Sequence, residues 1–97
     1  MTREEALTRL RQHEAELRQL GIDHLYLFGS TARDEASGHS DVDLFFDHER
    51  GRIGLYELMD VKARTAEILG CKADVMTRRS LHPALKPRIE AAAVQVF

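Results

Sequence analysis

The chain has 97 residues, of which 43% are hydrophobic and 31% are charged, and its 14 basic and 16 acidic residues give a formal net charge of −2. This length and composition are typical of one soluble globular domain, which we expect to span residues 1–97. The nearly balanced charge argues against a protein that coats nucleic acid, so we expect no direct nucleic-acid binding. A separate substrate domain does not fit in this length, and a large substrate would have to come from a partner chain.

The sequence argues against a membrane-spanning, a secreted or a disulfide-linked protein. No run of about 18 apolar residues is present, so we expect no membrane-spanning helix and no membrane partner. The N-terminal segment is charged throughout, unlike a secretory signal peptide. The single cysteine, Cys71, excludes an internal disulfide and a cysteine-based zinc site. We therefore expect a cytoplasmic protein.

The chain opens with a pattern that predicts one long helix. Thr2 and Glu5 match a capping box, and Gly21 suits the C-terminal end of the helix. Between them the apolar residues recur at helical spacing. These residues are Ala6, Leu7, Leu10, Leu17 and Leu20.

Residues 24–28 are apolar and aromatic, which predicts a short strand covered on both faces. Gly29 and Ser30 follow this strand. Ser30 is a suitable N-cap for a short helix from Thr31 to about Ala36. Residues 37–40 then predict a turn.

The second half of the chain predicts a strand, a helix, a strand and a final helix. Residues 41–47 alternate with a period of two, and residues 72–77 form another short strand. A helix from Leu55 to Leu69 follows from the apolar residues Leu55, Leu58, Val61, Ile68 and Leu69 and ends at Gly70. The run 88–95 favours a last helix. These elements predict an α+β fold, a small sheet packed against helices.

Two acids in the second predicted strand suggest a metal site. Asp41 and Asp43 would lie on one side of the strand, about 7 Å apart. Two carboxylates at this distance repel by about 2 kcal/mol, and a bound cation removes the repulsion. Mg²⁺ binds one or two carboxylates together with water and phosphate oxygens. The alternative is an exposed strand face on which the two acids are merely solvated.

Gly29 and Ser30 suggest a phosphate site, because free N–H groups at a helix N-terminus bind phosphate. Gly29 allows a close approach of the backbone to a ligand, and Ser30 adds a hydroxyl donor. Simple helix capping is the alternative for an isolated Gly-Ser pair. The combined spacing GSx10DxD places the phosphate site and the acids side by side.

Asp74 is a third acid, in the last predicted strand, where Asp is normally rare. Three converging carboxylates can hold two metal ions for in-line displacement at phosphorus. Asp74 would then also orient or deprotonate an attacking hydroxyl.

The segments from Phe28 to Arg33 and from Ser40 to Leu44, together with Asp74, resemble the minimal nucleotidyltransferase domains of the DNA polymerase β superfamily. The resemblance implies the nucleotidyltransferase fold, a small mixed sheet backed by helices. It implies that the chain is an enzyme that transfers AMP from ATP to a hydroxyl group. The residues that it assigns are Gly29, Ser30 and Arg33 for the nucleotide, and Asp41, Asp43 and Asp74 for catalysis and two Mg²⁺ ions.

Small members of this family are often antitoxins, so the resemblance also implies a partner. That partner would be a HEPN-type ribonuclease toxin, modified on a tyrosine near its active site. The first alternative is a non-catalytic antitoxin that neutralises the toxin by binding alone, and the second is a transferase for a small molecule.

Three features leave alternatives open. Family members commonly have Gly after the arginine, but here Asp34 follows Arg33, and an acid beside the triphosphate would weaken nucleotide binding unless it points to solvent. Arg33 itself suits either a phosphate contact or an ion pair. Late in the chain lies a basic group that is solvated or meets phosphate, RNA or an acidic partner. Its members are Arg78, Arg79, Lys86 and Arg88.

Overall fold

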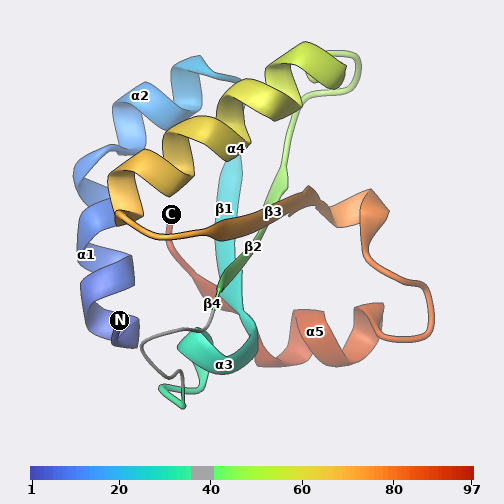
Figure 1. Cartoon of the computed structure of the whole chain (residues 1–97). Helices are drawn as coiled ribbons and strands as arrows, with labels where there is room; N and C mark the ends of the chain where they lie inside the picture. The colour runs from blue at the N-terminus through green and yellow to red at the C-terminus, as the bar shows by residue number, and fades with distance from the viewer. Residues whose placement is uncertain (36–40) are drawn as a thin grey trace.

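Four strands form one mixed sheet in a computed structural model that describes residues 1–35 and 41–97 (Figure 1). The strands are β1 (His24–Phe28), β2 (Val42–Asp47), β3 (Ala73–Thr77) and β4 (Val94–Gln95), and their order in the sheet is β3-β2-β1-β4. β1 is antiparallel to both β2 and β4, whereas β2 and β3 are parallel. The expected α+β fold is therefore confirmed, while the turn at 37–40 and the helix end at Ala36 lie outside the described residues.

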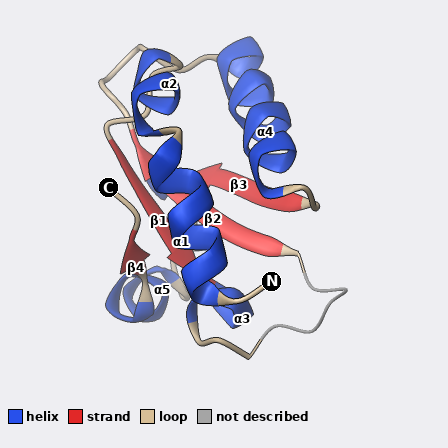
Figure 2. Ribbon diagram, turned by 90° about the vertical axis from the view of Figure 1, so that its left-hand side faces the viewer, coloured by secondary structure: helices blue, strands red, loops and turns tan. Residues whose placement is uncertain are grey.

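Three helices pack on one face of this sheet: α1 (Arg3–Gln12), α2 (Glu14–Gln19) and α4 (Leu55–Leu69) (Figures 1 and 2). Three short helical segments complete the fold, namely α3 (Gly29–Ala32), the 3₁₀ turn η1 (Arg78–Ser80) and α5 (Lys86–Ala92). The core lies between the three packed helices and the sheet. Its fully buried residues include Leu10, Leu17, Leu25, Leu27, Val42, Leu44, Phe46, Val61 and Val75. Within the described ranges, no helix is long and apolar enough to cross a membrane.

The prediction of one long N-terminal helix is wrong, because the chain turns at His13 and forms two helices. Thr2 does cap the first helix as predicted, since its hydroxyl accepts a hydrogen bond from the N–H of Glu5 at 3.1 Å. Between the buried residues Leu10 and Leu17, no side chain anchors the helix to the core.

The prediction of a final helix over 88–95 is also only partly right. α5 covers Lys86–Ala92, and the chain then continues as β4, which pairs with the free edge of β1. The alanine run favours helix, but the unpaired N–H and C=O groups of β1 need a partner and the residues after Ala93 supply it. Val96 is buried at the end of this strand.

The long helix has the predicted bounds, and of its five predicted apolar residues Leu58, Val61, Ile68 and Leu69 pack in or against the core, whereas Leu55 does not. Leu55 is 70% exposed, and the buried residues of α4 are Val61, Thr65 and Leu69. Gly70 ends the helix in the left-handed conformation that glycine adopts readily, with φ = +71°.

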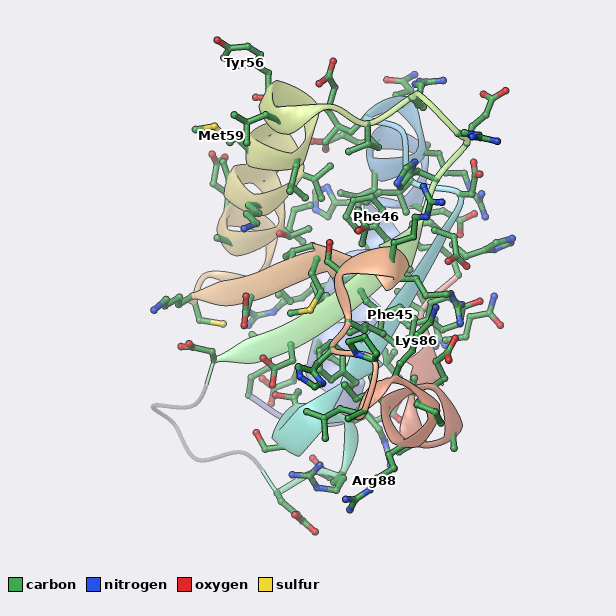
Figure 3. All side chains as sticks on the ribbon, turned by 90° about the vertical axis from the view of Figure 1, so that its right-hand side faces the viewer. Phe45, Phe46, Tyr56, Met59, Lys86 and Arg88 are labelled. Atoms are coloured by element: carbon green, nitrogen blue, oxygen red, sulfur yellow. The ribbon has the colours of Figure 1, made fainter. Side chains whose placement is uncertain are left out.

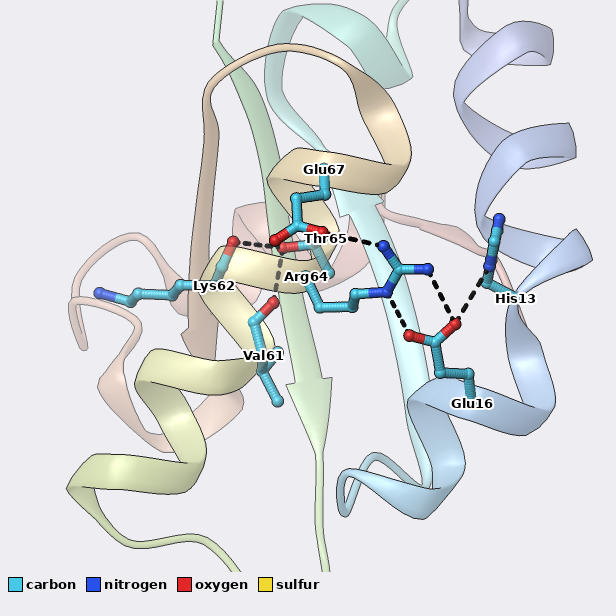
Figure 4. Close-up of polar contacts among 7 residues, drawn as sticks. All are labelled: His13, Glu16, Val61, Lys62, Arg64, Thr65 and Glu67. Atoms are coloured by element: carbon cyan, nitrogen blue, oxygen red, sulfur yellow. Dashed lines mark hydrogen bonds and ion pairs between the residues drawn. The ribbon is translucent and has the colours of Figure 1, made fainter.

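An ionic network joins α2 to α4 (Figure 4). The guanidinium of Arg64 donates two hydrogen bonds to the carboxylate of Glu16, one of them 3.1 Å long at Nη2, and a third of 3.1 Å to Glu67. His13 lies 3.3 Å from the same Glu16 carboxylate. The hydrogen bonds from Arg64 hold the pKa of Glu16 below its usual value of 4.5.

The lowered pKa of Glu16 predicts a pH-dependent contribution to stability. A carboxyl group with a lowered pKa stabilises the folded state above its unfolded pKa of 4.5, and this contribution disappears as the pH falls through the folded-state pKa. Thermal unfolding should therefore show that Glu16→Gln lowers Tm at pH 7 but not at pH 3. The control Glu67→Gln removes one more exposed contact of Arg64 and should lower Tm less at pH 7. Equal Tm differences at both pH values would contradict this account of Glu16.

Candidate active site

One row of residues crosses the sheet and defines the candidate site. Phe28 at the end of β1 pairs with Asp43 in β2, and Asp43 pairs with Asp74 in β3. Partners in this row lie on the same face of the sheet. The core is on the other face, formed in β2 by Val42, Leu44 and Phe46. Asp41 precedes β2 by one residue and so has the same orientation as Asp43 along the chain.

Gly29 follows Phe28 and lies directly against the Asp43 side chain. Its φ is +75°, and a β-carbon at this position would collide with the carboxylate of Asp43. Glycine is therefore required at this position both by the backbone conformation and by the available space. The Gly-Ser turn and the carboxylate that the spacing predicted to be neighbours are indeed in contact.

Asp43 is the most electrostatically strained acid of the site. Partial burial raises its pKa above the usual 3.8, and the charges of Asp74 and Asp41 raise it further. Arg33 acts in the opposite direction and lowers the pKa of Asp43. The folded chain thus holds acids close enough to repel one another, with one guanidinium as partial compensation.

The fit of this site to a divalent cation follows from these charges. Asp41 is exposed and lies 3.8 Å from Lys72, a weak surface ion pair. Among residues 1–35 and 41–97, no three His, Cys, Asp or Glu side chains are arranged as a complete metal site. The acids alone therefore suit an ion that takes its other ligands from phosphate and water, as Mg²⁺ prefers.

Ser30 is not the N-cap of a helix, contrary to the sequence prediction. α3 begins at Gly29, its N-cap is Phe28, and Ser30 is the second residue of the helix. The first N–H groups of a helix have no partner within it, so those at Gly29 and Ser30 remain available to a ligand. Ser30 is half-buried beside them.

Arg33 forms one of the two contacts that the sequence left open, an ion pair, while its contact with phosphate stays a prediction. Its guanidinium Nε donates to Glu35 at 3.1 Å, but the two side chains are 55% and 66% exposed, so the pair contributes little. Arg33 also lines a cavity of about 430 Å³ beside Gly29. The other lining residues are Phe28, Leu85, Arg88, Ile89 and Ala92.

The sequence analysis did not assign the residues of α5 that line this cavity to the site. It named Arg88 only as a member of the basic group late in the chain, for which a phosphate contact was one of the alternatives. A helical stripe of Leu85, Arg88, Ile89 and Ala92 was the available signal, since these positions recur at i, i+3, i+4 and i+7.

The Asp34 side chain is directed at the start of α1. Its φ is +60°, the left-handed conformation that Gly adopts freely and Asp tolerates. The carboxylate accepts a hydrogen bond of 3.0 Å from the N–H of Arg3 at the start of α1. A carboxylate at a helix N-terminus is stabilising. Asp34 therefore replaces the usual glycine without directing its charge at the Gly-Ser turn.

Arg78 holds α5 over the sheet and so corrects the solvated interpretation of this arginine. It donates hydrogen bonds of 2.6 and 3.0 Å to Asp47 and another to Glu90 on α5. Its guanidinium also lies 4.8 Å from the ring centre of Tyr26 and 5.0 Å from that of Phe45. These two rings stack at 4.8 Å. The pKa of Arg78 is raised mainly by the hydrogen bonds to Asp47.

Comparisons with known proteins agree with this geometry. The family model of the nucleotidyltransferase domain matches residues 10–96. A candidate protein adenylyltransferase of Methanocaldococcus jannaschii is 40% identical over 77 residues, which are 79% of this chain and 82% of that protein. The protein adenylyltransferase MntA of Thermococcus cleftensis is 30% identical over 97 residues, 99% of this chain and 97% of that protein.

Solved structures show the same fold. A candidate minimal nucleotidyltransferase superposes with a TM-score of 0.83 at 30% identity over 97% of this chain and 95% of that one. A chain from a toxin–antitoxin complex with AMP-PNP gives 0.74 at 19% identity, over 90% of this chain and 72% of that one. A chain from a complex of tri-AMPylated Shewanella oneidensis HEPN toxin with an MNT antitoxin superposes with a TM-score of 0.65 at 18% identity. The match covers 90% of this chain and 68% of that one.

A mixed sheet with a Gly-Ser turn against a row of acids defines a nucleotidyltransferase fold. The chain belongs to the nucleotidyltransferase domain family, and its expected class as a nucleotidyltransferase enzyme is confirmed.

A comparison of two glycine variants should separate local strain from damage to the site. Gly29→Ala places a β-carbon against Asp43 in a left-handed backbone, and we expect a loss of about 1–2 kcal/mol in stability together with loss of nucleotide binding. Gly51→Ala has a similar φ of +79° but no atom within 4 Å of the added carbon, so it should lose stability alone. Chemical denaturation and nucleotide titration measure the two effects. Unchanged nucleotide binding in folded Gly29→Ala would contradict the role of this contact.

Asp43→Asn should stabilise the metal-free chain. The raised pKa of Asp43 means that stability falls as the pH rises above 3.8, because the folded state holds this proton more tightly than the unfolded chain. Removing a partly buried charge that is also repelled by Asp74 and Asp41 should raise Tm at pH 7 in EDTA. The gain should vanish below pH 3.8. A lower Tm at pH 7 would contradict the repulsion.

Proposed function

We propose that this chain is a Mg²⁺-dependent protein adenylyltransferase that transfers AMP from ATP to a tyrosine hydroxyl of a HEPN-type toxin, and that it acts in the cytoplasm as the antitoxin. The observation that carries the proposal is the row of Asp43 and Asp74 across two strands, with Gly29 packed against Asp43. Phosphate-binding N–H groups and metal-binding carboxylates thus lie side by side in one domain.

Each site residue has a role that its position supports. The free N–H groups of Gly29 and Ser30, with the Arg33 guanidinium, bind the phosphates. Asp41, Asp43 and Asp74 would hold two Mg²⁺ ions, which neutralise phosphate charge and polarise the phosphorus when bound. Asp74, the exposed acid at the outer end of the row, orients the attacking hydroxyl and accepts its proton. The hydroxyl oxygen bonds to the α-phosphorus, and pyrophosphate leaves.

The partner is inferred from relatives. The T. cleftensis relative is named a protein adenylyltransferase, and the S. oneidensis complex holds an AMPylated HEPN toxin with an MNT antitoxin. The non-catalytic alternative gains no support from Asp34, since its carboxylate is bound to the N–H of Arg3.

Intact-mass spectrometry tests the reaction directly. A HEPN-type protein of the same genome, sought first in the neighbouring reading frame, is incubated with this chain, ATP and Mg²⁺. We expect its mass to increase by one or more AMP units, and the double variant Asp41→Asn/Asp43→Asn should lower the rate by at least about 1000-fold, because the site loses its metal-binding charges. Tyr→Phe replacement in the modified peptide then identifies the acceptor.

Two results would count against this function. An unmodified toxin in a stable complex would favour neutralisation by binding alone. Equal modification by the double variant would show that the acids of β2 do not carry the chemistry.

A further inference from the structure

We propose that α5 forms the second wall of the nucleotide site and that Arg88 on this helix binds the phosphates of ATP, opposite Arg33. This inference deepens the proposed function and rests on it. The cavity of about 430 Å³ beside Gly29 carries it, because α3 and α5 close this cavity from two sides. Figure 3 shows Arg88 on α5, on the same side of the molecule as the end of β1 and α3.

One face of α5 is directed entirely at the cavity. Leu85, at the N-cap, and the helix residues Arg88, Ile89 and Ala92 all line it, and they are spaced at i, i+3, i+4 and i+7. Glu90, on another face of the helix, binds Arg78. The ion pair between Arg78 and Glu90 therefore fixes the orientation of α5, because Arg78 is also hydrogen-bonded to Asp47 in the sheet.

The chemistry of the lining matches a nucleoside triphosphate. The two charged side chains, Arg33 and Arg88, are both guanidinium groups, which bind phosphate through paired hydrogen bonds. The remaining side chains are apolar, and Leu85 is 49% exposed in the open cavity. A flat nucleobase would cover this apolar wall, while the phosphates reach the N–H groups at Gly29.

Arg88 lines the cavity, unlike Arg78 and Lys86, the other basic residues near α5. Arg78 is occupied by Asp47 and Glu90, and Lys86 lies on α5 outside the cavity lining. Arg88 is exposed and faces the cavity with Arg33. Lys86 is therefore a matched control, a cation on the same helix that does not line the site.

Isothermal titration calorimetry of the full chain with Mg²⁺ and α,β-methylene-ATP, which is not cleaved at the reacting bond, measures this contact without the acceptor. We expect Arg88→Ala to raise Kd by about 10-fold or more, as for loss of a charge-assisted hydrogen bond. Arg88→Lys should give an intermediate Kd, and Lys86→Ala should stay within about 2-fold of the wild-type value.

Inorganic triphosphate separates the two parts of the ligand. Arg88→Ala should weaken triphosphate and nucleotide alike, whereas Leu85→Ser should weaken only the nucleotide, because Leu85 lies under the base. Circular dichroism confirms that each variant is folded.

Results that overturn the role of Arg88 can be distinguished from results that overturn the proposed function. Wild-type AMP transfer together with an unchanged Kd in Arg88→Ala, or equal losses in Arg88→Ala and Lys86→Ala, would overturn the role of Arg88 and leave the enzyme in place. A Leu85→Ser variant with wild-type Kd would overturn the apolar wall. Failure of the wild-type chain to bind the nucleotide at all would overturn both proposals.

Discussion

The central strand β2 imposes the constraint on which the site depends. Its core face, with Val42, Leu44 and Phe46 fully buried, fixes the register with β1 and β3, because a shift by one residue would move these side chains to the opposite face, out of the core. The same register places Asp43 beside Asp74 on the opposite face. Hydrophobic burial on one face thus holds together carboxylates that would separate if the strand were free.

This arrangement concentrates strain at the candidate site. The raised pKa of Asp43 and the left-handed backbone at Gly29 are both unfavourable in the chain by itself. A cation and a phosphate would relieve the charge repulsion and occupy the free N–H groups. On the far side of the cavity, Arg78 joins Asp47 to Glu90 and places α5 opposite the Gly-Ser turn. The site is therefore formed by segments that are distant in sequence.

Local patterns predicted the elements well where one physical effect dominated. The helix 55–69 and the strands near 24–28, 42–47 and 73–77 have the expected positions, because their apolar patterns are clear and the helix and the first strand both end at a glycine. Predictions failed where contacts with residues distant in sequence determined the local structure. The N-terminal helix breaks at His13, Leu55 is exposed, and the residues from Val94 extend β1 rather than a helix, since a sheet edge gains more from pairing than a helix gains from two further residues.

The sequence by itself determined the α+β class and the nucleotidyltransferase family. The spacing of Gly29, Ser30, Asp41 and Asp43 also predicted that the Gly-Ser turn and the acids are neighbours, because each lies at or near an end of a short element, where local geometry fixes its direction. Only the tertiary structure decided the direction of Asp34, the role of Arg78 and the cavity wall of α5. These depend on contacts between residues far apart in the chain, such as Arg78 with Asp47, and no local pattern specifies such a pair.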